Sequence, residues 1–534
     1  MLGSVPGSTL GFKPGPLPRL LCRLAMTVMV TLWLTGIAGA QGGVLRVGLP
    51  SISTSLDPAT ALEGSVSIIA RQMFDTLVQY REVTSDIEPG LAAQWSVSRD
   101  GLVWTFRLRD GVRFQDGTPL TAQHVVESLA RVIQPDAPHA PSPNAAAPRL
   151  VRGTPGVVKE IRAVDARTVQ IGLLLPYAPL PAVLAHPAFS IVLTSSLGQR
   201  WVGTGPFALT EASQGRVVLD ANPSYWAGAP RSTRLIFVET GEDARGEAML
   251  EAQAVDVILP PTAPARQSGA LSVPSWRIGY LALETEKDPF RQARARRAVA
   301  AALDPSLLAP AVGEVGVPLL SFLPLGVWGR RDGPPVLEAN PANAKKLLAE
   351  AGFLRGTSAG LLIGDGGKRV DQSRVAEAIR DSLAVAGVTV PIQIESPEAA
   401  LQLARTGQHQ MALLEARVEA GDPHFLLYPL SSSEGASKGS ATNMSFYRNR
   451  TLDDLLIRAS QVSFRPERQR LYFRAQAMLS EEVPWVPLYV RLHWGVARAD
   501  VRNLRLHPSG NPRFDRVWVD QPAPSLPPTS APGR

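Results

Sequence analysis

The chain has 534 residues, of which 45% are hydrophobic and 19% charged. This length exceeds what one hydrophobic core usually organises, and this composition excludes a wholly disordered chain, so we expect two or three globular domains. The formal net charge is +7, but three basic residues lie in the first 40 positions, which contain no acid, so the remainder carries only +4. Since no recognition motif accompanies the scattered arginines, we expect no nucleic-acid partner.

The N-terminus has the three parts of a secretory signal. Its basic segment contains Lys13, Arg19 and Arg23, an apolar run covers residues 24–38, and small residues precede Gln41. We expect residues 1–40 to be a signal peptide that is cleaved before Gln41. The alternative is an uncleaved anchor, but the apolar run is shorter than the about 20 residues that a membrane-spanning helix needs.

The single cysteine, Cys22, precedes the apolar run and lacks the small residues of a lipoprotein site. After cleavage the mature chain would contain no cysteine, so we expect neither lipid attachment at this position nor disulfide bonds. A chain without cysteine also avoids mispairing in an oxidising compartment.

Strand and helix patterns begin at the start of the mature chain. Residues 44–50 predict a strand, the polar turn 51–57 follows it, and residues 66–78 predict a helix. We expect the turn to lie at the sheet edge, facing a cleft.

Residues 95–118 have the pattern of antiparallel strands. Trp104, Phe106 and Leu108 alternate with polar side chains at period two, and three Asp-Gly pairs indicate tight turns. Thr121 then predicts the N-cap of a helix with one apolar face.

The remaining segments combine strands with amphipathic helices, which is typical of an α/β fold. Residues 134–156, rich in Pro and Ala, predict a surface loop, and residues 521–534 predict a disordered tail. The other predicted elements are strands over 157–175 and 215–220, helices over 343–351 and 466–482, and a helix-to-strand unit over 373–394.

The sequence lacks the common patterns of metal and cofactor sites. Its seven histidines are not spaced as zinc ligands, and neither a phosphate-binding loop nor a dinucleotide fingerprint occurs, so we expect no metal and no cofactor. One Gly-x-Ser-x-Gly pattern surrounds Ser358, but a predicted helix precedes it and a strand follows, the reverse of a hydrolase nucleophile elbow. We favour a helix-to-strand loop, and a nucleophilic Ser358 is the alternative.

Five stretches of the chain, in a fixed order, form one long pattern. The longest begins LAAQWSVSRDGLVWTFRLRDG and covers residues 91–132. The others include GTGPFAL with NPSYWAG, PFRQARARRAVAAALD, AKKLLAEAGF and GDPHFLLYPLSS, and they lie at residues 203–228, 289–304, 344–353 and 421–490. Together they resemble the large solute-binding proteins of peptide and nickel ABC importers, family 5, with one departure at Arg297, where the family usually has Gln.

The resemblance implies an α/β fold of two lobes joined by two crossing strands, with the ligand cleft between the lobes. The first lobe would contain residues 41–277, including an inserted subdomain at about 86–200, and residues 490–520. The second lobe would contain residues 278–489. The predicted hinge strands are Arg277–Leu283 and Pro487–Arg491.

The same resemblance implies the periplasmic substrate-binding component of an ABC transporter. Such a protein would capture a peptide-like or amine-bearing solute and deliver it to permease subunits at the inner membrane, as a monomer and without catalysis. The alternatives are a sensory receptor of the same fold and a periplasmic serine hydrolase. The ligand stays open, because nickel-chelate, sugar and opine binders share this fold.

Glu419 is the main candidate for a ligand contact. Peptide-binding relatives carry an aspartate four residues before the proline of the Gly-Asp-Pro turn, here Pro423, and that acid binds the ammonium group of the peptide. Glu419 keeps the charge on a longer side chain, while Ala416 replaces an aromatic residue of the family, which puts ordinary peptide specificity in doubt. The alternative for Glu419 is a solvated turn residue.

The resemblance also suggests weaker candidates for ligand contacts. Serines of the turn after the first strand would lie near the cleft, and two aromatic residues would line it. The alternatives are helix capping for the aspartate and core packing for the aromatic residues. These candidates are Ser53, Ser55, Asp422, Phe207 and Tyr489.

Overall fold

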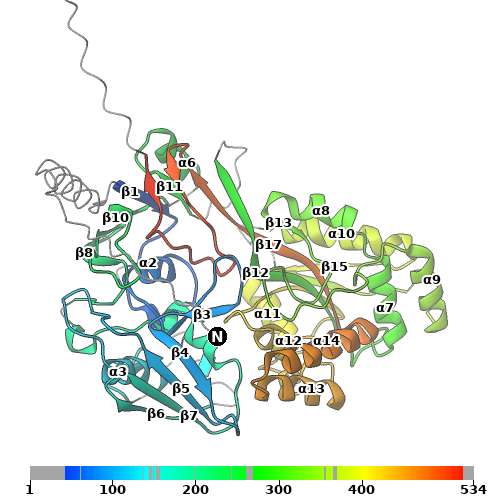
Figure 1. Ribbon diagram of the computed structural model, residues 1–534. Coiled ribbons are helices and arrows are strands. Elements are labelled where there is room, and N and C mark those ends of the chain that lie inside the picture. Colours follow the sequence, from blue (N-terminus) through cyan, green and yellow to red (C-terminus); the bar gives the residue numbers. More distant parts are fainter. Residues whose placement is uncertain are drawn as a thin grey trace, which may run out of the picture. The chain divides into compact units, whose positions relative to one another are not determined.

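Two sheets organise the described part of the chain (Figure 1). The computed structural model describes residues 42–520 except 54, 61, 135, 143–146, 148–149, 152–156, 199, 242, 260–268, 354–356 and 365–369. The predicted signal peptide and the predicted C-terminal tail therefore lie outside the described residues.

The larger sheet contains eleven strands. They are β1 (Gly42–Leu49), β8 (Phe207–Ser213), β9 (Arg216–Ala221), β10 (Ser232–Glu239), β11 (Val257–Ile258), β12 (Ala270–Leu283), β13 (Gly316–Pro318), β14 (Leu361–Gly364), β15 (Ile392–Glu395), β16 (Met411–Arg417) and β17 (Trp485–Ala497). Their order is β15-β14-β16-β12-β17-β11-β1-β10-β9-β8, and β13 pairs with β17 outside this path.

The long strands β12 and β17 connect the two halves of this sheet. They pair antiparallel from Ala270 opposite Val496 to Ala282 opposite Trp485, with a register shift between Pro274 and Ile278. Strand β11 extends the sheet from β17 on one side, and β16 extends it from β12 on the other. Both segments that the sequence predicts as hinge strands lie within this pair.

The smaller sheet has four strands in the order β4-β5-β7-β6. These are β4 (Ala92–Val97), β5 (Val103–Leu108), β6 (Val158–Asp165) and β7 (Thr168–Leu173), and helix α3 (Ala122–Ile133) packs on β6 and β7. Two two-stranded ribbons complete the strands: β2 (Val78–Tyr80) with β3 (Ile87–Pro89), and β18 (Val501–Arg502) with β19 (Trp518–Val519).

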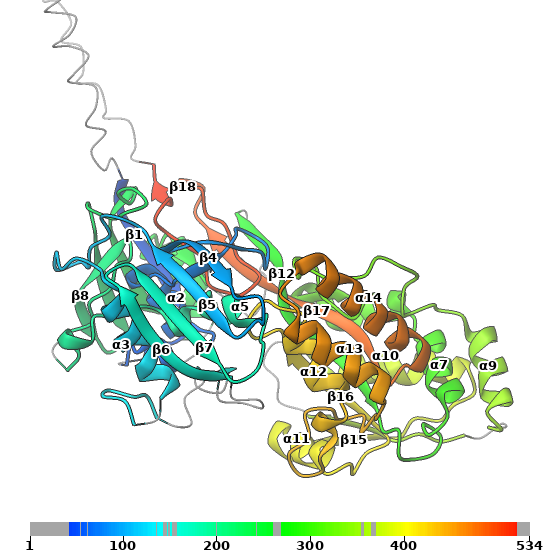
Figure 2. The same ribbon diagram turned by 60° about the horizontal axis from the view of Figure 1, so that its bottom comes forward.

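Eight helices cover both faces of the sheet in the second lobe (Figures 1 and 2). They are α7 (Ala293–Ala302), α8 (Pro305–Val312), α9 (Pro341–Glu350), α10 (Gln372–Val385), α11 (Pro397–Arg405), α12 (His424–Ser431), α13 (Arg450–Gln461) and α14 (Arg465–Glu482). Leu281 and Leu283 of β12 pack with α7–α10, whereas Tyr280 and Ala282 pack with α11–α14. This period-two alternation is what a strand buried on both faces requires.

In the first lobe, helix α2 (Ser65–Met73) covers one face of β1, and α6 (Asp243–Glu251) lies beside β11 on the other. The short helix α5 (Leu180–Leu184) contacts β2. The buried side chain of Gln72, in α2, donates to the carbonyl of Pro512 at 2.9 Å and accepts from the backbone N–H of Phe514 at 3.0 Å. The two ends of the described chain therefore share one core.

Local predictions are mostly confirmed, with two corrections. Thr121 caps α3, and a reciprocal bond with His124 completes the cap. The helix predicted over 66–78 ends at Met73, because Phe74 is extended and the following Asp75 accepts bonds from three distant side chains. Strand β1 is paired on both sides and lies inside the sheet, so the turn 51–57 follows the end of a central strand.

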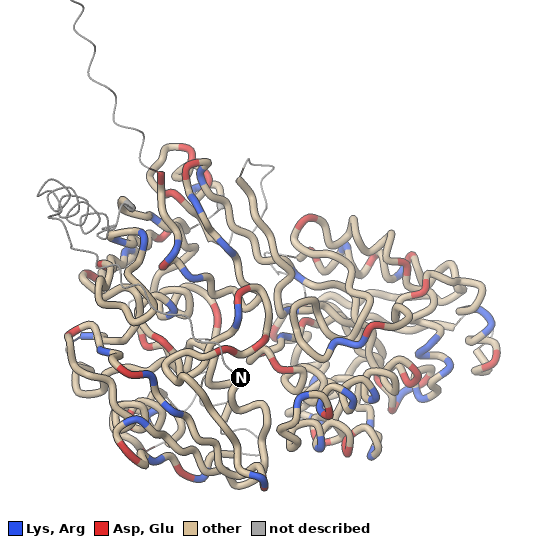
Figure 3. The backbone as a smooth tube through the Cα atoms, in the orientation of Figure 1, with Lys and Arg blue, Asp and Glu red and all other residues tan. Residues whose placement is uncertain are grey.

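Acidic and basic segments are mixed along the backbone (Figure 3). Among the residues that the structure describes, no single helix is long and apolar enough to cross a membrane. The pair α7 and α8, bent by 66° where they meet, reaches that threshold only together.

Candidate functional site

Five charged residues form an ion-pair network where β12, β16 and β17 meet the start of α2. We call Glu63, Arg277, Glu415, Arg417 and Arg491 the arginine–glutamate network. Glu63 lies 2.5 Å from Arg277 and 3.0 Å from Arg417, and Glu415 lies 3.1 Å from Arg491. The network joins distant parts of the chain, because Glu63 precedes α2 while Glu415 and Arg417 lie in β16.

Glu63 is held in its charged form by this network. Burial by itself would raise the pKa of Glu63, but Arg417 and Arg277 outweigh it and lower the pKa to about 2. In Arg417, burial lowers the pKa, while Glu63 and Glu419 oppose that effect. The negative charge of Glu419 therefore acts on the same arginine that Glu63 binds.

His186 fixes the backbone beside this network. Its Nδ1 accepts a hydrogen bond from the N–H of Ala188 at 3.1 Å, so Nε2 carries the proton and donates to the carbonyl of Leu62 at 2.9 Å. The same carbonyl accepts from Arg417 at 2.8 Å. Burial, with Arg417 nearby, lowers the pKa of His186 to about 3, so this histidine is neutral at pH 7.

Glu419 lines a cavity of about 640 Å³, which we call the Glu419 cavity. The residue lies in the turn between β16 and α12 and is half-buried. Within the described part of the chain its carboxylate has no hydrogen-bond or ion-pair partner. Other residues around the cavity are Leu150, Tyr177, Ala416, Arg417, His424 and Phe425.

A second cavity, of about 420 Å³, is lined by three residues of the same network. We call it the hinge cavity, and its lining includes Ser51, Glu63, Gly64, Ser65, Arg277, Arg491, His493 and His507. Helix α2 begins here, and its N-cap, Gly64, has no side chain to bond the first backbone N–H groups. Arg277 and Arg491 are already paired with Glu63 and Glu415, so the feature of this cavity that favours a negatively charged group is the helix N-terminus.

The side chain of Asp422, three residues after Glu419, is buried inside the protein. Only 2% exposed, its carboxylate lies 2.9 Å from Arg468 and accepts from the N–H of His424 at 3.0 Å. The hydroxyl of Tyr472 lies 3.4 Å away. These contacts agree with the capping alternative, and Asp422 does not line the Glu419 cavity.

The other four candidates do not gather around Glu419. Ser53 and Ser55 are exposed on the turn after β1, where the hydroxyl of Ser53 accepts from the N–H of Ser55. Phe207 is fully buried in the first-lobe core, and Tyr489 is fully buried with its hydroxyl 3.3 Å from Glu415. The structure thus places both aromatic residues in core packing, the alternative weighed for them. As ligand contacts, all four stay predictions.

Ser358 is exposed between α9 and β14, and its backbone bridges Thr389. The order helix, serine, strand agrees with the sequence analysis and is the reverse of a nucleophile elbow.

Sequence reasoning missed the arginine–glutamate network. A signal for it existed in β16, where Glu415 and Arg417 follow four buried apolar residues of the same strand. A second signal was that the predicted hinge segments begin or end at Arg277 and Arg491. Charged residues inside buried strands need partners, which makes them candidates for a site.

Comparison with known proteins gives one consistent result. The model of bacterial extracellular solute-binding proteins, family 5 middle region, matches residues 86–438. Di/tripeptide-binding protein 2 of Pseudomonas aeruginosa is 30% identical, over 90% of this chain and 96% of that protein. Heme-binding protein A of Haemophilus influenzae is 29% identical, over 87% and 90%.

Among solved structures, HbpA2 from Haemophilus parasuis superposes with a TM-score of 0.81 at 26% identity, covering 90% of this chain and all of that one. This match supports the two-lobed fold with a cleft between lobes joined by crossing strands. The family match extends over most of the chain, and the first of these relatives aligns almost end to end. The chain therefore belongs to the bacterial extracellular solute-binding proteins of family 5.

Proposed function

We propose that this protein captures a peptide-like solute through its cationic amine and delivers it to the permease of an ABC importer. The observation that carries the proposal is the carboxylate of Glu419, half-buried at a cavity and without a hydrogen bond or ion pair among the described residues. Arg417 and Arg277 feel its charge but do not contact it. A partly shielded carboxylate without a direct contact favours a cationic partner. An ammonium group of the solute would supply that partner.

The hinge cavity supports a ligand that also carries a negative group. The N-terminus of α2 lies there with Arg277 and Arg491, whereas Glu419 lines the other cavity. A zwitterion with its ammonium toward Glu419 and its carboxylate toward the N-terminus of α2 would match both features, because Arg491 is already paired with Glu415. A short peptide has this form, and one relative is a di/tripeptide-binding protein.

Calorimetry tests the role of Glu419. A panel of dipeptides and tripeptides is screened by thermal shift, and the strongest binder is titrated into wild type and Glu419→Gln. Truncating one partner of a shielded charge pair costs about 2–5 kcal/mol, so we expect affinity to fall at least about 30-fold. Glu398→Gln, an exposed acid on α11, is the matched control and should bind as wild type does.

The N-acetylated form of the same peptide makes the test specific. It lacks the ammonium group, so it should bind weakly to wild type and equally weakly to Glu419→Gln. Binding of the free peptide to Glu419→Gln within about twofold of wild type would contradict the proposal. Hemin is titrated in parallel because one relative is a heme-binding protein, and tight hemin binding with no peptide binding would also contradict it.

We further propose that the protein acts outside the cytoplasm as a monomer, with residues 1–40 removed. The tripartite N-terminal pattern and membership of an extracellular family support export and cleavage, and the monomeric state is an expectation from the sequence. Mass spectrometry of material from the native host should give a chain beginning at or near Gln41, and gel filtration should give the mass of one chain. An intact Met1 in exported protein would contradict it.

A further inference from the structure

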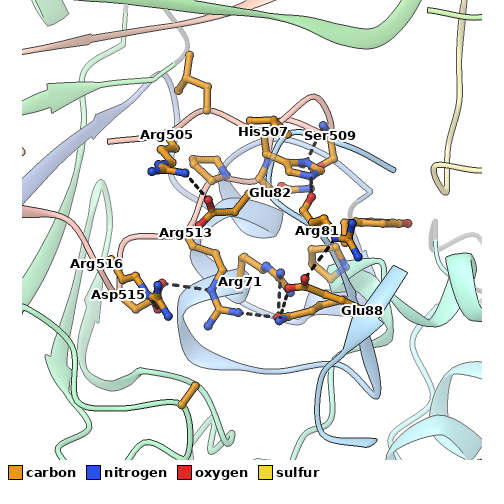
Figure 4. A pocket seen from close by; sticks show the side chains of 18 of the residues that line it. Arg71, Arg81, Glu82, Glu88, Arg505, His507, Ser509, Arg513, Asp515 and Arg516 are labelled. Carbon is orange, nitrogen blue, oxygen red and sulfur yellow. Dashed lines mark hydrogen bonds and ion pairs between the residues drawn. The ribbon is translucent and has the colours of Figure 1, made fainter. Parts of the chain in front are cut away.

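A third cavity, of about 410 Å³, lies apart from Glu419 (Figure 4). Its lining comes from α2, from β2 and β3 with their connecting turn, from Pro187, from Trp226 and Ala227, and from the return segment 503–516. None of these residues lines the Glu419 cavity. We call it the arginine cavity, because its lining contains Arg71, Arg81, Arg505, Arg513 and Arg516.

Four of these arginines already have acidic partners. Arg505 lies 2.6 Å from Glu82, and Arg513 lies 3.2 Å from Asp515, as the dashed lines in Figure 4 show. Arg81 and Arg516 are 3.9 and 4.0 Å from Glu88 and Asp515. Five arginines against three carboxylates leave the described lining with a formal excess of two positive charges.

Arg71 differs from the other four. It is 7% exposed, and no described carboxylate lies within ion-pair distance of it. Its hydrogen bond, to the side-chain oxygen of Gln79, is 3.5 Å long. Burial, followed by the like charge of Arg513, lowers the pKa of Arg71 to about 10, although the negative charges of Asp75 and Asp515 act in the opposite direction. The C-terminal end of α2 offers Arg71 partial negative charge but no full counter-ion.

Asn511 is a second residue of the same cavity whose side chain lacks hydrogen-bond partners within the described part of the chain. It is 5% exposed, and neither its Nδ2 nor its Oδ1 has a hydrogen-bond partner among the described residues. A buried amide without partners is unfavourable, and its N–H groups would suit an anion. Neither Arg71 nor Asn511 lines the hinge cavity, although the two cavities share the segment around His507.

We propose that the arginine cavity binds a small anion carrying a carboxylate or phosphate group, held by the guanidinium of Arg71 and the amide of Asn511. A guanidinium suits both groups, because its planar N–H donors match two oxygens of either. The volume is that of a small-molecule site rather than of a single water. Neither Arg71 nor Asn511 takes part in the proposed solute contacts, although the arginine cavity and the hinge cavity share lining residues around His507.

Calorimetry with inorganic phosphate and with succinate tests the proposal and separates the two chemistries. The protein is titrated in a Tris buffer that contains neither ion. We expect at least one of them to bind with a Kd at or below about 1 mM. Arg71→Gln and Asn511→Leu should each weaken that binding at least tenfold, whereas Arg474→Gln, exposed on α14 and outside the cavities described, should not change it.

Thermal unfolding without added anion gives a second readout. Because Arg71 has no counter-ion, Arg71→Gln should unfold at the wild-type temperature or above, and Asn511→Leu likewise. The anion should raise the unfolding temperature of wild type and of Arg474→Gln only. The proposal is overturned if neither ion binds, if both variants bind as wild type does, or if Arg71→Gln is destabilised in the absence of anion.

Discussion

Asp422 and Glu419 are acids of the same turn, yet their carboxylates have opposite surroundings. Asp422 is enclosed with Arg468, Tyr472 and a backbone N–H, while Glu419 lines a cavity with no partner in the described part of the chain. The first charge is satisfied by the fold, so it serves stability. The carboxylate of Glu419 has no such contact among the described residues, so it is available to a solute. Three positions along a chain are enough to separate the two roles.

The largest expected effect on stability is that of replacing the buried Asp422. Asp422→Asn should lower the free energy of unfolding by about 3–5 kcal/mol, because it leaves the buried Arg468 without its counter-ion. Urea unfolding followed by circular dichroism measures this loss. A loss below about 1 kcal/mol would show that Asp422 contributes little to stability, and the contrast with Glu419 would then be wrong.

His186 is a buried group whose hydrogen bonds require its neutral form, so protonation should destabilise the fold. Its pKa is about 3 in the folded protein and about 6.5 when unfolded, so the unfolded state binds the proton first as pH falls. Stability that is complete above pH 6.5 should therefore decrease between pH 6.5 and 3, by about 1.4 kcal/mol per pH unit from this residue.

Unfolding midpoints in urea, measured across this pH range, test the contribution of His186. His186→Asn keeps an acceptor beside Ala188 but cannot be protonated, so its stability should depend less steeply on pH than that of wild type. Parallel pH profiles for the two proteins would contradict the argument.

The expected effect of Glu419→Gln on stability is small. Without solute, its free energy of unfolding should lie within about 0.5 kcal/mol of wild type, since no described contact is lost. The same urea experiment as for Asp422→Asn measures it. A destabilisation as large as that of Asp422→Asn would show that Glu419 is also a structural charge.

No effect is expected at Ser358. A helix precedes Ser358 and a strand follows it, which is the reverse of a nucleophile elbow. Ser358→Ala should therefore change neither solute affinity nor stability. Hydrolysis of p-nitrophenyl acetate by wild type, lost in Ser358→Ala, would reverse this conclusion.

Local signals predicted much of the fold, whereas the site depends on contacts that no local signal carries. The cap of α3 joins Thr121 and His124, only three positions apart, so Thr121 could be predicted as the N-cap from the sequence. The bond between Glu63 and Arg277 joins residues 214 positions apart, and the end of α2 at Met73 depends on distant partners of Asp75. The family resemblance supplied Glu419, but it did not show that Asp422 would be sealed inside.

The contacts of Gln72 also set an order of events during synthesis. Its amide bonds the carbonyl of Ile68 in the same helix, but its other two bonds are to Pro512 and Phe514, about 440 positions later. Phe514 also packs against Phe237 in the same core. At about 5–20 residues per second, a ribosome needs roughly 20 to 90 seconds to make that stretch. The first lobe, although it begins the chain, is thus completed only after the second has emerged.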